Sequence, residues 1–399
     1  MNKVPLKRVA RIIAGQSPKS EDVTPLTAGI PFLQGNAEFG PENPKPKFEC
    51  NLASKYCDTG DILLSVRAPV GAVNIADRRY AVGRGVCAIR AESVDQRYLW
   101  WWLNGQSEIL NSVATGSTYS AVTAEQVGAI EVPAMGLGEQ RRIADFLDAE
   151  VGLVEAAGWK RREVSVLARQ RHRALIDMEI VKLSEKFGDR LLRRSIVGME
   201  QGFSPLCDNY PASEGEWGVL KVSSVKLGVF TEEENKHYPE GDASMSRYEV
   251  KEGDLLVTRA NTPSLVGSVA LVPRVREKLL ISDKIFRVKT SGNIDPRFLA
   301  FAAGGSRIRG MCAMASHGTS QSMVNLKSEE IKAWPIPAAP LDEQARAAAR
   351  FEESRVFTDR LRELADRQIQ LLEERKRALI TAAVTGQIDV TTARGADVS

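Results

Sequence analysis

Two stretches of the sequence open in the same way: EQRRIADFLDAE at residues 139–150 and EQARAAARFEES at residues 343–354. The second begins 204 residues after the first, and the same offset holds through RALI at 173–176 and 377–380. A match over 38 residues without an insertion leaves no room for a loop, which predicts one continuous helix in each copy. Two long helices therefore organise the fold.

The two predicted helices need a partner for their apolar side chains. A helix of 38 residues is ~57 Å long, too long for a small domain to cover, so we expect each helix to pack against the other. Apolar side chains recur at intervals of three and four residues, the spacing of a coiled-coil seam. The predicted seam consists of Leu153, Ala157, Val164 and Leu167 in the first helix and Phe357, Leu361, Leu364 and Leu371 in the second.

The segments between the helices repeat as well. TGDILLSVR at 59–67 corresponds to EGDLLVTR at 252–259, and RYLWWWL at 97–103 corresponds to RFLAFAA at 297–303. Short apolar runs bounded by Gly, Asp and Pro predict strands. The expected fold class is α+β: two α/β globules alternate with two long helices that pair as an antiparallel coiled coil, in a pseudo-two-fold internal repeat. The expected boundaries are 1–137 and 181–337 for the globules, 138–180 and 338–390 for the helices, and 391–399 for a flexible tail.

Composition and charge narrow the class of protein only slightly. Of the 399 residues, 43% are hydrophobic and 26% are charged, which is typical of a soluble globular protein. No signal peptide and no run of about 20 apolar residues is present, so we expect a cytoplasmic protein without membrane contact. The net charge of +3 does not by itself indicate nucleic-acid binding. Five cysteines without a CxxC pair predict reduced thiols.

The combination of features resembles one known family, the specificity subunits of type I restriction-modification systems. The resemblance rests on EQRRIADFLD at the start of a long helix, LLEERKRALITAAVTGQID at the end of the second, and the tandem order of globule and helix. It covers nearly the whole chain and implies that the globules are target recognition domains. In that family each domain reads one half of a split, asymmetric site in double-stranded DNA, and the paired helices fix the gap between the halves.

The resemblance also implies partners and cofactors. The helices of the family dock two adenine methyltransferase subunits, which bind S-adenosylmethionine, and two motor-nuclease restriction subunits can then join, for which ATP and Mg are implied. The chain itself is expected to be a non-catalytic subunit that binds no cofactor. One departure is the second helix opening, where Ala347 and Arg350 replace Ile143 and Phe146. This difference predicts that the two long helices do not bind their partner subunits equally.

The sequence lacks motifs for chemistry of its own. It contains neither a GxxxxGK[ST] phosphate loop nor an N-P-P-Y type adenine loop, and ENPKPK at 42–47 lacks the second Pro and the aromatic residue. The three histidines lie far from any Cys pair with metal-ligand spacing, so no metal site is expected. We therefore predict neither catalytic nor metal-ligating residues.

Candidate DNA contacts occupy corresponding positions of the two globules, where base readout and phosphate contact call for Arg, Lys, amide and hydroxyl side chains. Basic residues follow the matched strands, hydroxyl residues follow matched glycines, and the side chains after the first buried strand differ between copies. The candidates are Gln34, Asn36, Arg67, Arg84, Ser117 and Thr118 in the first globule and Lys221, Ser223, Arg259, Lys284, Thr319 and Gln321 in the second. Solvated surface charges, strand-edge charges and helix caps are the alternative interpretations of these positions.

Partner contacts are predicted at the helix openings, on Ile143, Phe146, Leu147 and Phe351. The three adjacent tryptophans at 100–102 favour core packing over base stacking, because the corresponding FLAFAA contains no tryptophan. An assembly scaffold that does not bind DNA, with a coiled-coil core, remains the alternative function.

Overall fold

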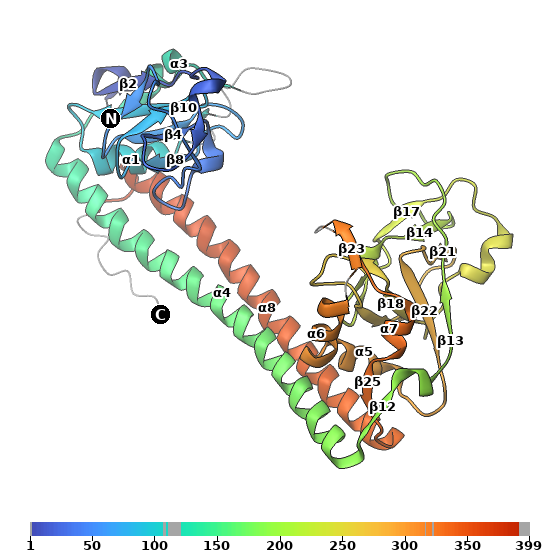
Figure 1. Cartoon of the computed structure of the whole chain (residues 1–399). Coiled ribbons are helices and arrows are strands. Elements are labelled where there is room, and N and C mark those ends of the chain that lie inside the picture. Colours follow the sequence, from blue (N-terminus) through green and yellow to red (C-terminus); the bar gives the residue numbers. More distant parts are fainter. Residues whose placement is uncertain (1, 107–108, 111–120, 316, 321–322, 391–399) are drawn as a thin grey trace. The chain divides into compact units, whose positions relative to one another are not determined.

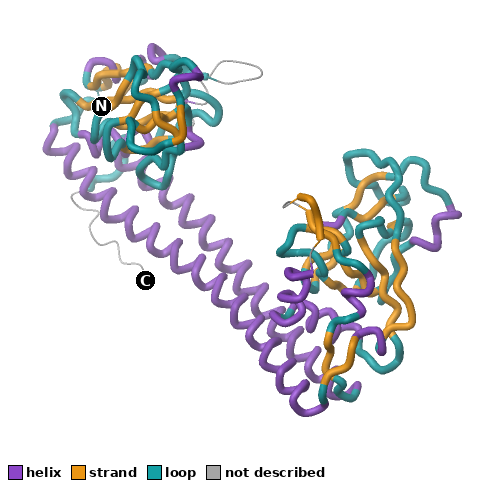
Figure 2. Tube along the Cα trace, in the orientation of Figure 1, coloured by secondary structure: helices purple, strands orange, loops and turns teal. Residues whose placement is uncertain are grey.

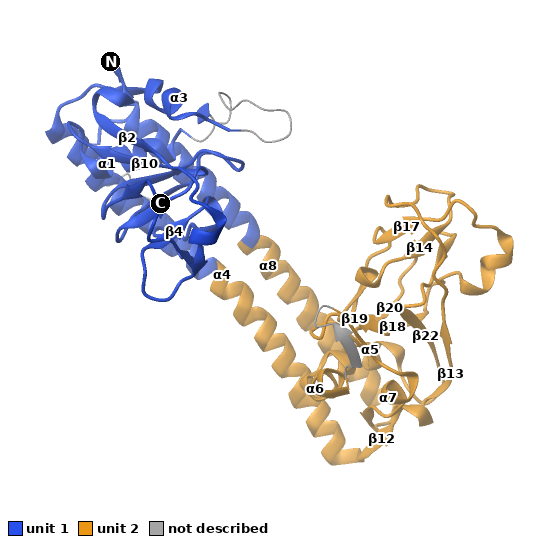
Figure 3. Cartoon of the chain, turned by 45° about the horizontal axis from the view of Figure 1, so that its top comes forward, with its two compact units in different colours: residues 1–161, 366–399 blue, residues 162–365 orange. Residues whose placement is uncertain are grey.

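The computed structural model describes residues 2–106, 109–110, 121–315, 317–320 and 323–390. The chain forms two compact units (Figure 3). Unit 1 comprises residues 1–161 and 366–399, and unit 2 comprises residues 162–365. Each unit contains one globule and one part of each long helix, whereas the sequence analysis treated the helices as separate domains. The predicted tail at 391–399 lies outside the described residues.

The two long helices are α4 (Leu137–Phe187) and α8 (Leu341–Val384) (Figures 1 and 2). Helix α4 begins one residue before the predicted start and continues seven residues beyond the predicted end, and α8 lies within its predicted range. Gly188 follows α4 and Gly386 follows α8, with φ of 71° and 72°. This left-handed conformation is the usual way to end a helix, and glycine adopts it without a Cβ clash.

Within each unit the two helices run antiparallel. In unit 2, His172 lies 3.0 Å from Ser354, and Lys186 pairs with Glu343. In unit 1, Lys376 pairs with Glu155. Later residues of one helix thus meet earlier residues of the other, as an antiparallel coiled coil requires.

The predicted seam between the helices is wrong. Leu153 exposes 67% of its surface and Phe357 52%, and Val164, Leu167, Leu364 and Leu371 are exposed too. The buried side chains on the two helices that belong to neither globule core are instead Val154, Ala168, Thr358 and Ala365. Small residues at the closest approach let the helices pack, so the large apolar residues form a second stripe that faces solvent.

Unit 1 contains two main sheets. A four-stranded antiparallel sheet has the order β2-β10-β7-β8, and a five-stranded sheet has the order β3-β5-β4-β9-β6. The first consists of β2 (Ala10–Ala14), β10 (Val86–Ala91), β7 (Ile62–Ser65) and β8 (Val73–Ile75). The second consists of β3 (Thr24–Pro25), β5 (Phe48–Glu49), β4 (Pro31–Leu33), β9 (Tyr80–Val82) and β6 (Tyr56–Cys57). Strands β1 (Lys3–Pro5) and β11 (Glu131–Pro133) pair separately, and helices α1 (Gln96–Asn104) and α3 (Ala124–Ala129) complete the globule.

Unit 2 repeats this topology. The order β13-β22-β18-β20 corresponds to β2-β10-β7-β8, and β14 pairs parallel with β21 as β4 does with β9. The first sheet consists of β13 (Ile196–Gln201), β22 (Ile285–Thr290), β18 (Leu255–Thr258) and β20 (Val269–Leu271). The second consists of β17 (Asn235–His237), β14 (Gly218–Leu220) and β21 (Leu279–Leu280). The remaining strands are β12 (Asp189–Leu191) with β25 (Pro335–Pro337), β15 (Val225–Lys226) with β16 (Val229–Phe230), and β19 (Ala260–Asn261) with β24 (Met323–Asn325) and β23 (His317–Ser320). Its shorter helices are α5 (Pro296–Gly304), α6 (Ser306–Ala315) and α7 (Ser328–Lys332). Each globule is mixed α+β, as predicted.

The repeated Glu-Gln at the helix openings has a structural explanation. The buried Gln140 side chain accepts a hydrogen bond from the Asp95 amide at 2.6 Å and donates to the Met135 carbonyl at 2.9 Å. Gln344 makes the equivalent bonds to the Asp295 amide at 2.9 Å and the Ala339 carbonyl at 2.7 Å. Each glutamine therefore joins the start of a long helix to the globule that precedes it.

The repeated RALI is explained by the opposite ends of the same helices. Ile380, near the end of α8, is buried in the core of unit 1, where the Tyr98 hydroxyl donates to the Val384 carbonyl at 3.1 Å. Ile176, on the C-terminal part of α4, is buried in the core of unit 2. Each globule thus packs on the start of the helix that follows it and on the end of the other helix.

The residues predicted to contact partners lie in these cores. Ile143 and Leu147 are 2% and 0% exposed in unit 1, and Phe351 is 0% exposed in unit 2. Phe146 is partly buried against the unit 1 core. The prediction of partner contact is therefore wrong for the three buried side chains, because their own globule already covers them.

The departure noted in the second helix opening also lies inside the protein. Ala347 is buried in unit 2 in the same core as Trp334, which stands where unit 1 has Ile130. The larger Trp334 offsets the smaller Ala347. Arg350 pairs with Glu179 of α4 at 2.9 Å. The difference between the two openings is therefore a change of core packing and ion pairing.

The adjacent tryptophans of α1 pack in the core as predicted. Trp101 and Trp102 are buried, and the Trp101 indole donates to Asp148 of α4 at 2.7 Å. Trp100 is partly buried and packs edge-on against Trp101.

Candidate nucleic-acid interface

In unit 1, three candidate residues lie on neighbouring backbone segments. The Gly85 amide donates to the Gln34 carbonyl at 3.2 Å, and the Val66 amide donates to the Gly85 carbonyl at 3.0 Å. These bonds bring together the end of β4, the turn before β10 and the end of β7. Gln34, Arg67 and Arg84 are exposed there. Neither arginine forms an ion pair with a described residue, so both guanidinium groups are available for an anion.

A buried hydroxyl fixes the loop that follows Arg67. Ser65 donates to the Arg67 carbonyl at 2.9 Å and to the Pro69 carbonyl at 2.8 Å. In unit 2 the corresponding hydroxyl of Thr258 donates to the Leu265 carbonyl at 3.1 Å and accepts from the Ser268 amide at 2.9 Å. Arg67 and Arg259 therefore leave equivalent, well-anchored strand ends.

In unit 2, Arg259 and Lys284 are neighbours. The Arg259 amide donates to the Lys284 carbonyl at 2.8 Å, and the Leu326 amide donates to the Arg259 carbonyl at 2.8 Å. Both side chains are partly exposed. The structure thus brings together the pair that corresponds to Arg67 and Arg84.

The segments that contain the hydroxyl candidates lie only partly within the described residues. The hairpin of β23 and β24 pairs with β19 directly after Arg259, which places the backbone of Thr319 on the same small sheet. Ser117, Thr118 and Gln321 lie outside the described residues.

Lys221 and Ser223 follow β14 and share an acidic neighbour that the sequence analysis missed. The Ser223 hydroxyl donates to Glu234 at 2.5 Å, and the Lys221 ammonium lies 3.8 Å from the same carboxylate. The hydrogen bond from Ser223 lowers the pKa of Glu234, which is ionised at neutral pH. Their counterpart Asn36 begins a short 3-10 helix and is partly exposed. The two units therefore present different polar groups on equivalent elements.

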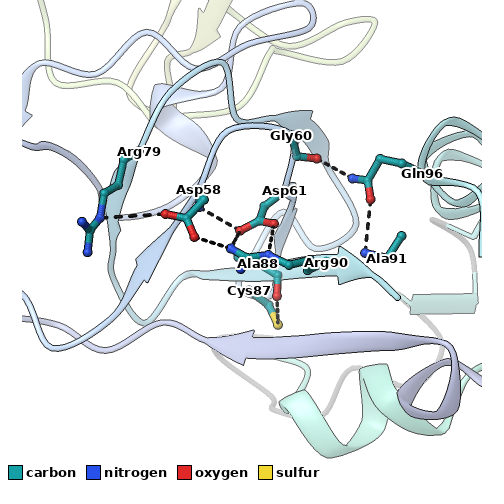
Figure 4. Close-up of polar contacts among 9 residues, drawn as sticks. All are labelled: Asp58, Gly60, Asp61, Arg79, Cys87, Ala88, Arg90, Ala91 and Gln96. Atoms are coloured by element: carbon teal, nitrogen blue, oxygen red, sulfur yellow. Dashed lines mark hydrogen bonds and ion pairs between the residues drawn. The ribbon is translucent and has the colours of Figure 1, made fainter. Parts of the chain in front are cut away.

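A partly exposed ion-pair cluster lies at the start of β7, the strand that leads to Arg67. In Figure 4, Arg90 of β10 lies between Asp58 and Asp61. Its guanidinium donates two hydrogen bonds to the buried Asp61 and one to Asp58, each at 2.7 Å. These bonds raise the pKa of Arg90. In unit 2, Arg287 lies 3.1 Å from Asp254, the counterpart of Asp61. The repeated Gly-Asp is therefore a structural signal.

No helix among the described residues is long and apolar enough to cross a membrane. No group of three or more His, Cys, Asp and Glu side chains among them is arranged to hold a metal ion.

Comparison with known proteins identifies a family model that matches the first part of the chain and relatives that match part of it. Residues 1–154 match the family model of the type I restriction modification DNA specificity domain. The putative type I restriction enzyme MjaX specificity subunit of Methanocaldococcus jannaschii is 39% identical over 155 residues, 38% of this chain and 36% of the relative. The EcoEI specificity subunit of Escherichia coli is 32% identical over 169 residues, 42% of this chain and 28% of the relative. These matches span about a third of the length of the relatives.

Weaker matches extend along the chain. The EcoKI specificity subunit of Escherichia coli K12 is 22% identical over 289 residues, 70% of this chain and 62% of the relative. A solved structure described as the basis of complex assembly and conformational transition of the type I R-M system has a TM-score of 0.65 and 17% identity. It covers 97% of this chain and 98% of the other. At this identity the match shows a shared fold over the whole chain.

Proposed function

From the match of residues 1–154 to the type I restriction modification DNA specificity domain, we propose that the chain is a specificity subunit and selects the DNA sequence on which such a system acts. Each globule contacts one half of a bipartite, asymmetric site in double-stranded DNA. The observation that carries the proposal is the repeated, anchored strand end with unequal side chains. Gln34, Arg67 and Arg84 occupy it in unit 1, and Arg259 and Lys284 occupy it in unit 2.

The side chains divide by chemistry into two roles. Arginine and lysine at both strand ends contact phosphates, which fixes each globule on the duplex. Gln34 and Asn36 in unit 1, and Lys221 and Ser223 in unit 2, contact base edges, because amide, ammonium and hydroxyl groups offer distinct hydrogen-bond patterns in the major groove. An equivalent scaffold with different readers gives two different half-sites.

The partner-docking surface is the exposed stripe of the long helices. In unit 2, Val164, Leu167, Phe357 and Leu361 line a groove of about 610 Å³ between α4 and α8. A groove of this kind accepts the apolar face of an amphipathic helix. We propose that a methyltransferase subunit docks in this groove, and not on the buried residues of the helix openings that the sequence analysis named. The stoichiometry of two methyltransferase and two motor-nuclease subunits remains the expectation from the family.

In this proposal the chain is non-catalytic and binds no cofactor. S-adenosylmethionine belongs to the methyltransferase subunits, and ATP and Mg belong to the motor-nuclease subunits. The contribution of the chain is to select the site through its two globules and to hold the subunits that act on it.

The test is to express the chain with its methyltransferase in a host without adenine methylation and to sequence the modified bases. We expect one split motif that disappears without the chain. Gln34→Ala should relax the bases of one half only, and Lys221→Ala those of the other half. The control is Gln370→Ala, an exposed glutamine of α8. Methylation without a motif, or a motif unchanged in both variants, would contradict the assignment of these readers.

The docking half of the proposal has its own test. Phe357→Asp places a charge in the apolar groove at a residue that is already exposed, so the chain should fold. We expect it to lose co-purification with the methyltransferase. Asp substitution of Met178, which is exposed on α4 outside the groove, is the control. Equal co-purification of the Phe357 variant and the control would exclude the groove as the docking site.

A further inference from the structure

Unit 2 contains a second concave surface on the long helices, distinct from the apolar groove. It has a volume of about 510 Å³ and is enclosed by α4, α8, α5 and the β15–β16 hairpin. Five basic residues and one acidic residue are among those that line it: Arg169, Arg173, Lys226, Arg355, Arg362 and Asp359. The remaining lining includes apolar side chains such as Ala300 and Phe301.

Three of the five cations form no salt bridge, although the charge of Lys226 also acts on the Glu234 carboxylate. Arg355 lies 3.2 Å from Asp359 and also pairs with Glu352, and Arg362 lies 3.6 Å from Asp359. Arg169, Arg173 and Lys226 form no salt bridge with any residue that the structure describes. The cavity therefore has an excess of positive charge, carried by exposed side chains that an anion can reach, beside apolar side chains.

The hairpin that carries Lys226 is held in place. Its turn consists of Leu227 and Gly228, with φ of 37° and 91°. A left-handed conformation is costly for leucine and persists only where the surroundings impose it. Lys226 pairs with Val229 across the hairpin, and the Gly228 amide donates to the Val269 carbonyl of β20 at 2.7 Å. The backbone at Lys226 is therefore preorganised at the rim of the cavity.

The two concave surfaces of unit 2 share Gln170 and Thr358 at their boundary, but their other lining residues on α4 project in different directions. At 100° per residue, Arg169 and Arg173 lie 40° apart, whereas Leu167 of the apolar groove lies about 160° from Arg169. An apolar partner helix can occupy the groove without reaching the basic cavity. The cavity is also lined by α5 and by the β15–β16 hairpin of the globule, and two predicted DNA contacts, Lys221 and Ser223, directly precede that hairpin in the sequence. A polyanion bound to the globule fits this side better than a second protein helix does.

Two of the positions that line the cavity carry different residues in unit 1. Trp100 stands where unit 2 has Ala300, and Glu373 of α8 stands where α4 has Arg169. A larger side chain and a negative charge replace open space and a positive charge. Arg169 and Ala300 are thus specific to unit 2, whereas Arg173 has a counterpart in Arg377 of unit 1.

We propose that the cavity formed by Arg169, Arg173 and Lys226 binds a backbone phosphate of the DNA that unit 2 reads. The proposal rests on the proposed function and adds a phosphate contact made by the helices. Arginine pairs a phosphate through two parallel hydrogen bonds, and two arginines with one lysine can share one phosphate or two adjacent ones. The contact carries no sequence information, so it strengthens binding to every DNA equally.

The test measures DNA binding against salt concentration for the full chain in complex with its methyltransferase. The wild type is compared with the double variant Arg169→Gln/Arg173→Gln on duplexes with the methylated motif and with a scrambled motif. Each phosphate contact adds about 0.9 to the slope of log affinity against log salt. We expect the slope of the double variant to be shallower than that of the wild type by about this amount per lost contact. Its affinities for the motif duplex and for the scrambled duplex should fall by the same factor. Arg169→Lys/Arg173→Lys should keep most of the slope, since charge is retained.

Arg193→Gln/Arg194→Gln is the charge-matched control, because both arginines are exposed in unit 2 and neither lines the cavity. A variant slope equal to that of the control would overturn the proposal. If the Arg169/Arg173 double variant lost its preference for the motif, the two arginines would belong to base readout. If the variant no longer bound the methyltransferase, the cavity would belong to protein binding. Either result would exclude a simple phosphate contact. If the wild-type complex bound the motif duplex and the scrambled duplex equally, the proposed function itself would be contradicted. This result is measured on the wild type alone, so it is distinct from a failure of the phosphate proposal.

Discussion

The end of α8 should stabilise the first globule, although about 280 residues separate them in sequence. Ile380 is 4% exposed in the core of unit 1, and Ile176 is 4% exposed in the core of unit 2. Replacing a buried isoleucine with alanine costs about 2–5 kcal/mol, because apolar contact is lost and a cavity remains. At 1.4 kcal/mol per factor of ten, even the lower figure increases the population of the opened unit about 30-fold.

Hydrogen exchange detected by mass spectrometry can locate the loss. In Ile380→Ala we expect faster exchange in α1 (residues 96–104), whose Tyr98 bonds to the end of α8, and little change in α5 (residues 296–304). Ile176→Ala should give the reverse result. If Ile380→Ala accelerates exchange in α5, or leaves α1 as protected as in the wild type, then the assignment of each helix end to the distant globule is wrong.

Three further predictions concern single contacts. Gln344→Ala leaves the Asp295 amide and two carbonyls without their buried partner, so we expect a loss of about 1–3 kcal/mol in unit 2 by urea unfolding, with the exposed Gln370→Ala unchanged. Burial lowers the pKa of His172 below its usual 6.5, so its neutral form is favoured by folding and stability should fall as pH drops through 6.5. His172→Gln should remove that part of the pH dependence of the urea midpoint, and an unchanged pH profile would contradict it. Asp61→Asn leaves Arg90 with only Asp58. Because Arg90 is partly exposed, we expect a loss of about 1–2 kcal/mol, measured by thermal unfolding against Asp366→Asn at an exposed aspartate of α8.

The repeat carried most of what the sequence could predict about the fold. A register of 204 residues between the helix openings and RALI predicted two continuous helices and two related globules, and the sheet orders of the two units agree with that prediction. The seam failed because residues such as Leu167 and Phe357 are both large and correctly spaced, and such spacing fits more than one face of a helix. The contact itself uses small residues such as Ala168 and Ala365, which a search for large apolar side chains passes over.

The candidate site was predictable at the level of strand ends and loops. Corresponding positions in the two copies led to Arg67 with Arg84 and to Arg259 with Lys284, and the structure brings each pair together through backbone hydrogen bonds. Glu234 was missed because it follows a different strand from Lys221 and Ser223, and only the folded sheet places the three together. Contact with DNA by any of these residues stays a prediction.

The helix openings show why a repeated motif need not mark a binding surface. Ile143 and Phe351 were expected to face partners because they belong to the best-matched segment of the two copies. A segment that joins a globule to a helix must satisfy buried amides and fill a core in both copies, and Gln140 and Gln344 meet that requirement with the same hydrogen bonds. Residues that act on different half-sites must instead differ between the copies. In a chain built from two copies, the matched positions therefore indicate the scaffold, and the unmatched residues on matched elements, such as Gln34 and Lys221, indicate where the two units diverge in function.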